Sequence, residues 1–177
     1  MEEIQPYTKT IRAGRAYIYG QFIQGLGFSS GGFSQYIKLY NLDDKHFYYI
    51  NVKPSLRSKK LNRFHNSVPA GRYIIYSYEW TKSKWYGGLR TTEGVYKNAT
   101  AKELDEKQKS GITIMESELE RFTLNIESGK VNYLGTWNFT DDKPVFTNEK
   151  QIADEDMQDT YYFKFFDLGQ AAVNIPQ

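Results

Sequence analysis

A turn and the strongest strand signal of the chain meet in the stretch Val68-Pro69-Ala70-Gly71-Arg72-Tyr73-Ile74-Ile75-Tyr76-Ser77-Tyr78-Glu79-Trp80. Pro69 presets the φ angle of a turn's second residue and Gly71 suits the fourth position, so the chain should reverse there. Because β-branched and aromatic residues follow, we predict a central strand. Strand alternation places four apolar residues on one face: Ile74, Tyr76, Tyr78 and Trp80.

The far end of this strand is a candidate binding surface, whereas its beginning is expected to be core. A later stretch carries Tyr133 and Trp137, which offer Ile74 and Tyr76 an aromatic surface to pack against. We therefore assign Ile74 and Tyr76 to the core and leave the residues from 78 to 86 as the binding candidate.

The composition favours a single β-rich domain. The chain has 177 residues, of which 40% are hydrophobic and 16% aromatic, including 15 Tyr and 11 Phe. A chain of this length can bury roughly 70% of its unfolded surface without disulfides. Aromatic residues favour the half-buried surfaces of sheets. We predict one domain over residues 1–177, with residues 1–12 as an extended lead-in.

Further strands and turns follow from alternation and turn residues. We expect a strand at 13–23, a hairpin of 35–40 with 46–52, a short strand at 64–68, a turn at 81–84, a strand at 85–96, and a second hairpin of 112–126 with 130–139. The prediction is an all-β fold, a single antiparallel β-sandwich of roughly seven to nine strands.

Two segments depart from the strand pattern. Residues 99–111 form a charged excursion, which is either a short solvated helix or a mobile segment because Leu104 is its only large apolar residue. Residues 154–168 have strand propensity, but Met157, Tyr161, Phe165 and Leu168 recur at helical spacing. We favour a C-terminal helix there, with a strand as the alternative.

Charge and cysteine content exclude several classes of function. A net charge of +2 lacks the basic excess of a dedicated nucleic-acid binder. The absence of Cys excludes thiol nucleophiles and disulfides but leaves the redox compartment open. No apolar run reaches the ~20 residues of a membrane span, and the first residues lack a signal-peptide pattern. The protein is either cytosolic or has lost a targeting segment.

The sequence supplies no convincing catalytic or metal-binding constellation. Residues 27–31 match G-x-S-x-G, but a strand rather than a helix should follow them. His46 lies near Asp43 and Asp44 and could form a catalytic cluster with them, but acids that cap a turn beside a strand histidine explain this grouping equally well. The acids at 154–159 lack the glycine and terminal glutamate of a calcium loop. We predict a non-enzymatic protein without a cofactor or metal.

Two groups of residues are candidate binding surfaces. Aromatic side chains on either side of one turn could form a platform for a sugar or planar ligand: Tyr78, Trp80, Trp85 and Tyr86. Core and rim packing is the alternative. A basic segment could bind phosphate, anionic lipid headgroups or acidic glycans through Arg57, Lys59, Lys60 and Arg63. A solvated loop is the alternative here.

Two motifs resemble those of small bacterial envelope lipoproteins of unknown function. They are the P-x-G-x-Y stretch at 69–73 and the G-K-x-x-Y-x-G stretch at 129–135. The resemblance covers about a third of the chain. It implies a β-sandwich, export to the periplasm or outer membrane, and a lipid-modified cysteine upstream of this segment. It implies no catalytic residue.

The leading functional expectation is a partner-binding or structural domain of the cell envelope, with an unknown envelope protein or glycan as its partner and no nucleic acid. Membrane anchoring would occur only through the removed lipid-modified segment. The alternative is a carbohydrate- or small-ligand-binding module that uses the aromatic platform. A cytoplasmic location is the alternative to the envelope.

Overall fold

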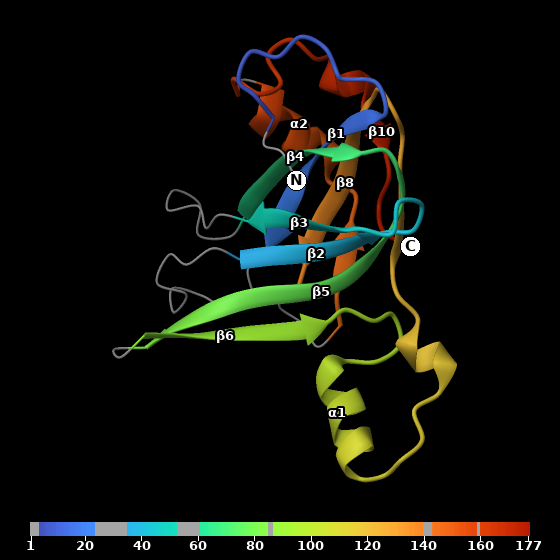
Figure 1. Ribbon diagram of the computed structural model, residues 1–177. Coiled ribbons are helices and arrows are strands. Elements are labelled where there is room, and N and C mark those ends of the chain that lie inside the picture. The colour runs from blue at the N-terminus through green and yellow to red at the C-terminus, as the bar shows by residue number, and fades with distance from the viewer. Residues whose placement is uncertain (1–3, 24–34, 53–60, 85–86, 140–142, 159) are drawn as a thin grey trace.

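The protein is a two-layer β-sandwich with a C-terminal helix, as the sequence predicts. The computed structural model describes residues 4–23, 35–52, 61–84, 87–139, 143–158 and 160–177. Within these residues, ten strands form two five-stranded sheets, here called sheet A and sheet B (Figure 1). Their facing sides enclose the main hydrophobic core.

Sheet A contains β1 (Arg15–Ile23), β4 (Leu61–Pro69), β8 (Val131–Asn138), β9 (Val145–Thr147) and β10 (Ala172–Val173). Sheet B contains β2 (Gln35–Asn41), β3 (Phe47–Val52), β5 (Gly71–Lys84), β6 (Gly87–Gly94) and β7 (Thr123–Ile126). The helices are α1 (Ala101–Lys109) and α2 (Lys150–Gln158), with 3-10 turns η2 (Glu116–Leu119) and η3 (Leu168–Gln170). Strand order is β10-β8-β1-β4 in sheet A and β3-β2-β5-β6 in sheet B, with β9 beside β8 and β7 beside β5. The pairing is not antiparallel throughout as predicted, because β8 pairs in parallel with β1 and β10.

Strand β5 is central to sheet B, as predicted, but its inward-facing residues differ from the prediction. The register against β2 shifts between Lys38 and Leu39, so β5 bulges at Tyr76. A bulge inserts one extra residue into the strand, so side chains beyond it point to the opposite face from the one that simple alternation predicts. Tyr73 and Ile75 are therefore buried before it, and the core assignment of Ile74 and Tyr76 is wrong: Tyr76 is 38% exposed.

The first predicted hairpin is confirmed as β2 and β3, whereas the second is wrong. β7 and β8 follow each other through the residues at 127–130, but β7 pairs with β5 and β8 pairs in parallel with β1 and β10. The connection crosses from one layer to the other. Leu124 and Trp137 both face the main core, from opposite sheets. Two strands in facing sheets that both point alternate residues into the core have the same sequence pattern as two strands of one hairpin, so the pattern alone did not distinguish them.

The turn predicted at 81–84 is also misplaced. β5 continues through these residues to Lys84, and β6 begins at Gly87 in direct pairing with it. The strand predicted at 85–96 therefore contributes only 87–94 to the sheet. The long β5–β6 hairpin extends beyond the end of sheet A (Figure 1).

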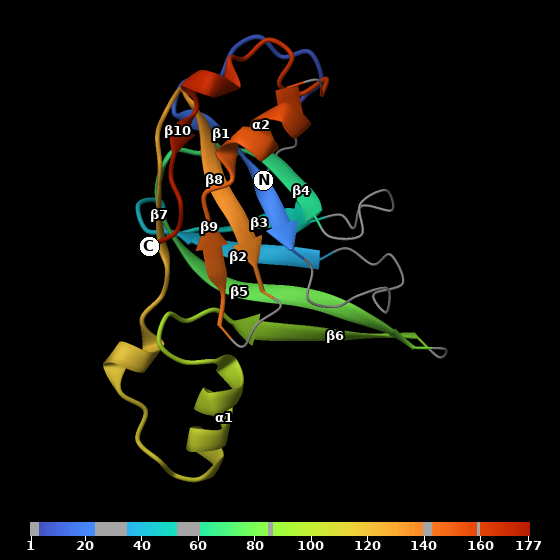
Figure 2. The same cartoon turned by 180° about the vertical axis from the view of Figure 1, so that it is seen from behind.

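Both departures from strand structure contain helices. The segment 99–111 forms α1, so its helical alternative is confirmed. α2 lies at 150–158 rather than 154–168, because the Thr160 hydroxyl and amide both bind the Met157 carbonyl, the hydroxyl at 2.6 Å, and tight turns follow. These turns bury Phe163 while Tyr161 stays 62% exposed. The two helices lie at opposite ends of the molecule (Figure 1, Figure 2).

A second hydrophobic cluster covers the outer face of sheet A. It joins Tyr19 of β1 and Tyr133 of β8 to Met157 and Phe163, and it also receives Ile4 from the lead-in. Strands β1 and β8 at the centre of sheet A are therefore buried on both faces. In the described parts of the chain, neither helix has the length or apolar character needed to cross a bilayer.

Candidate functional site

A cleft of about 900 Å³ lies between the β5–β6 hairpin, the first turns of α1 and the segment around β9. The bulge at Tyr76 determines its aromatic wall, because it turns the even-numbered residues of β5 inward from Tyr78 onward. Val145 of β9 lines the cleft together with Tyr78 and Trp80, so the face of sheet B that forms the core also forms one side of the cleft.

The wall is a stack of aromatic rings. Tyr78 stacks on Trp80 with ring centroids 5.1 Å apart and on Phe139 at 5.3 Å with nearly parallel planes. Tyr78 is buried and its hydroxyl donates to the Gln35 side chain, so it is the fixed base of the stack. Trp80 is only partly buried and borders the cleft. The stack thus holds the Trp80 ring against a space that a ligand can enter.

Glu93 is the charged group of this wall. It lies directly across from Tyr78 in the β5–β6 pairing. Although Glu93 is exposed, partial desolvation in the cleft wall raises the pKa of its carboxyl. Burial raises the pKa of the Tyr78 hydroxyl, and the Glu93 charge adds to that rise. Within the described residues no hydrogen bond or ion pair involves its carboxylate. It can accept hydrogen bonds from a ligand.

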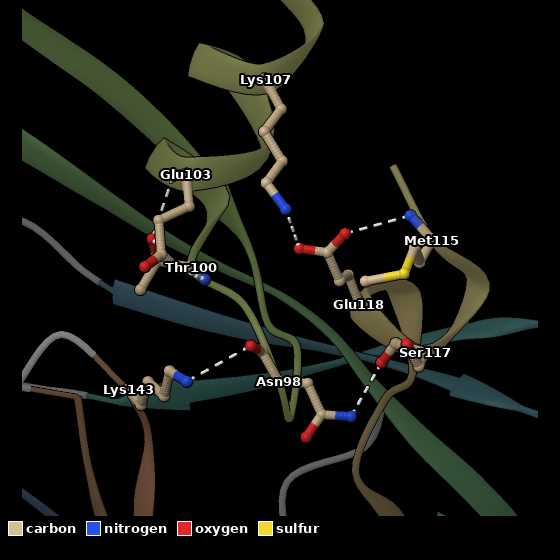
Figure 3. Close-up of polar contacts among 8 residues, drawn as sticks. All are labelled: Asn98, Thr100, Glu103, Lys107, Met115, Ser117, Glu118 and Lys143. Atoms are coloured by element: carbon tan, nitrogen blue, oxygen red, sulfur yellow. Dashed lines mark hydrogen bonds and ion pairs between the residues drawn. The ribbon is translucent and has the colours of Figure 1, made fainter. Parts of the chain in front are cut away.

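The opposite wall is the start of α1, where Thr100 and Glu103 form a reciprocal cap. Thr100 Oγ accepts from the Glu103 amide at 3.1 Å, and the Thr100 amide donates to the Glu103 carboxylate at 2.7 Å (Figure 3). This amide holds the pKa of the Glu103 carboxyl below its usual range. The cap makes the first turn of α1 a defined wall.

Side-chain contacts connect α1 to its surroundings. Lys107 pairs with Glu118 of η2, and the Asn98 side chain donates to the Ser117 carbonyl at 2.8 Å (Figure 3). From the other side, Lys143 donates to the Asn98 carbonyl at 3.3 Å. These contacts link the helix to η2 and to the segment that leads into β9, so three separate segments fix the shape of the cleft.

The structure brings together only part of the predicted sites. Tyr78 and Trp80 both line the cleft, whereas Trp85 and Tyr86 lie outside the described residues. Of the basic group, Arg57, Lys59 and Lys60 also lie outside them. Arg63 lies in β4 and binds Asp156 of α2 through its side chain at 2.7 Å, so its charge is already paired.

The candidate catalytic residues are dispersed. The G-x-S-x-G stretch lies outside the described residues. His46 is in an exposed turn, where its ring lies 2.6 Å from the Asp44 carbonyl, and Asp43 pairs with Arg72. Among the residues that the structure places, no group of three or more His, Cys, Asp or Glu side chains could hold a metal ion.

Sequence reasoning missed most of the cleft. Glu93, Phe139, Lys143 and the α1 residues come from segments far apart in the chain. One signal was available: with the turn placed at 85–86, strand pairing puts Glu93 across from Tyr78. Phe139 and Lys143 could not be found, because their position depends on the crossing between the two sheets.

Comparisons with known proteins assign no family. No family model matches the chain, and no curated protein matches it. A leucine-rich repeat protein from Bacteroides thetaiotaomicron is similar in structure, with 12% identity and a TM-score of 0.42. The match covers 78% of this chain and 15% of that protein. A likeness this distant bears on neither the fold nor the function.

Proposed function

We propose that the chain is a non-enzymatic binding module that holds a sugar or another small ring-shaped ligand in the cleft beside α1. One observation carries the proposal: Trp80, held by the stack on Tyr78 and Phe139, borders a cleft of about 900 Å³. A space of this size can take a ligand with one or a few rings.

Polar groups around the ring stack suit hydroxyl-bearing ligands. Glu93 offers a carboxylate beside the rings, and Lys102 and Glu106 line the helical side of the cleft. Apolar ring faces flanked by a few donors and acceptors are the usual chemistry of small-ligand pockets.

The cell-envelope location of this module, as a partner-binding or structural lipoprotein domain, stays a prediction from the lipoprotein resemblance. It concerns where the module works, whereas the cleft concerns what it binds. A lipid-attachment signal in the gene upstream of this segment would support the location, and its absence would contradict it.

Titration calorimetry with a panel of mono- and disaccharides tests the binding proposal. We expect at least one sugar to bind, and Trp80→Ala to weaken that binding about tenfold or more, since stacking on an aromatic ring is lost. Trp80→Phe keeps a ring and should retain most of the affinity.

Tyr161→Ala is the matched control, because Tyr161 is an exposed aromatic residue that does not line the cleft. Its affinity should equal that of the unmodified protein. Absence of binding by every sugar, or an equal loss in Tyr161→Ala and Trp80→Ala, would contradict the proposal.

A further inference from the structure

The outer face of sheet B carries a second aromatic surface, separate from the cleft. Phe47 of β3, Tyr49 of β3 and Tyr76 of β5 are 43%, 41% and 38% exposed. In the β2–β3 pairing, Phe47 lies across from Tyr40, and Tyr49 lies across from Lys38. Exposed rings that adjoin one another on a sheet face form a contiguous apolar surface, which isolated exposed residues do not.

A lysine lies in the middle of these rings. The Lys38 ammonium is 4.1 Å from the centre of the Phe47 ring, 5.6 Å from Tyr49 and 5.5 Å from Tyr76. Its aliphatic stem can cover the rings while the charge stays in water. No carboxylate pairs with Lys38 within the residues that the structure describes, so its charge is available to a partner.

A second cation, the Arg121 guanidinium, also contacts the Tyr76 ring. The Arg121 guanidinium lies 4.4 Å from the centre of Tyr76 and 4.3 Å from that of Tyr96. It donates to the backbone carbonyls of Tyr76 and Val95, which fixes its position. In the described part of the chain no acid pairs with Arg121 either. Tyr76 is thus flanked by two cations that lack an anion.

We propose that this surface, made of Lys38, Phe47, Tyr49, Tyr76 and Arg121, binds an acidic polysaccharide whose carboxylates are separated by neutral sugars. Sugar rings can stack on the exposed aromatic faces, and a carboxylate can pair with Lys38 or Arg121. Two cations among several rings match a sparsely charged chain. A nucleic acid, with a phosphate at every nucleotide, requires a broader basic surface than these two cations provide.

Binding to hyaluronan oligosaccharides, which carry one carboxylate per disaccharide, tests the proposal. Dextran serves as the neutral chain and an oligothymidylate of similar length as the nucleic acid. We expect hyaluronan to bind more tightly than dextran or oligothymidylate, and its affinity to fall with added salt because the charges are exposed.

Variants locate the site on the outer face. Lys38→Gln and Tyr49→Ala should each weaken hyaluronan binding about threefold or more, the scale of an exposed charge or ring contact. Lys9→Gln is the matched control, because it removes an ammonium 5.1 Å from the Phe165 ring on another part of the surface. Trp80→Ala, in the cleft on the inner face, should leave this binding unchanged.

Several results would overturn the proposal. They are equal binding of dextran, tighter binding of oligothymidylate, an equal loss in Lys9→Gln, and self-association of the protein that Tyr49→Ala abolishes. The last would identify the face as an interface between copies of the chain. Failure of sugar binding in the cleft leaves this test intact, since Trp80→Ala separates the two sites.

Discussion

At the scale of single residues, Glu93 links the cleft to stability. Although Glu93 is exposed, partial desolvation of its carboxyl in the cleft wall raises its pKa, so the folded state binds a proton slightly more readily than the unfolded state. Folding therefore loses stability as the pH rises through the raised pKa, and nothing is lost below the unfolded value of about 4. Glu93 is a residue whose charge works against the fold.

Glu93→Gln should consequently be slightly more stable than the unmodified protein at pH 7. The gain should disappear as the pH falls below about 4, where the Glu93 carboxyl of the unmodified protein is neutral in both the folded and the unfolded state. Urea denaturation across this range measures it. Glu116→Gln, which removes an exposed carboxylate of η2, is the control and should lack this pH-dependent gain. A larger gain at low pH than at neutral pH would contradict the assignment.

Residue identity predicted part of the site and not the rest. Alternation along β5 singled out Tyr78 and Trp80, which line the cleft, but placed Tyr76 with the core. The single extra residue of the bulge exchanges the two faces. Because that bulge depends on the register against β2, the sequence of β5 alone does not reveal it. The exposure of Tyr76 is what creates the outer aromatic surface.

At the scale of elements, α1 shows how a short polar helix can hold a defined place. Its sequence has one large apolar residue, Leu104, which is buried. The remaining order comes from the cap at Thr100 and from the Lys107–Glu118 pair. A nine-residue helix of this composition is marginal by itself, so these contacts decide its stability.

Thr100→Ala should therefore destabilise α1 by about 1 kcal/mol, the usual effect of losing an N-cap side chain. Hydrogen exchange should accelerate in the first turns of α1, where Ala101–Glu103 lie beside the cleft, while the amides of β2 keep their rates. Thr100→Ser preserves the capping oxygen and should behave like the unmodified protein. Unchanged exchange in Thr100→Ala would show that packing alone holds the helix.

Most elements were predictable from the sequence, but their pairing was less so. Strands β1, β2, β3, β4 and β8 follow from alternation, and the turn predicted at 41–45, found at 42–44, follows from its Asp residues. The partners of β7 and β8 did not follow, because an arch between sheets and a hairpin within one sheet bury the same alternate residues. To distinguish the arch from the hairpin, one must know which sheet has an unpaired edge strand next to β7 and to β8.

At the scale of the whole molecule, sheet A connects two hydrophobic clusters. β1 sends Ile18 and Phe22 into the main core and Tyr17 and Tyr19 into the outer cluster. The outer cluster is tied to the strand by the hydrogen bond from Tyr19 to Asp154 of α2. Because the same strands serve both clusters, neither should unfold without the other.

Phe163→Ala tests this coupling, since Phe163 is fully buried in the outer cluster and does not line the cleft. Its loss should lower the free energy of unfolding by about 3–5 kcal/mol. Trp137, which is buried in the main core, reports on the other side of sheet A when Trp80 and Trp85 are replaced by Phe. We expect Trp137 fluorescence and far-UV circular dichroism to shift together to the same lower urea midpoint, as one cooperative unit requires. A Trp137 transition that stays in place while helical signal is lost earlier would show that the C-terminal segment folds as a separate layer on a sandwich that is stable without it.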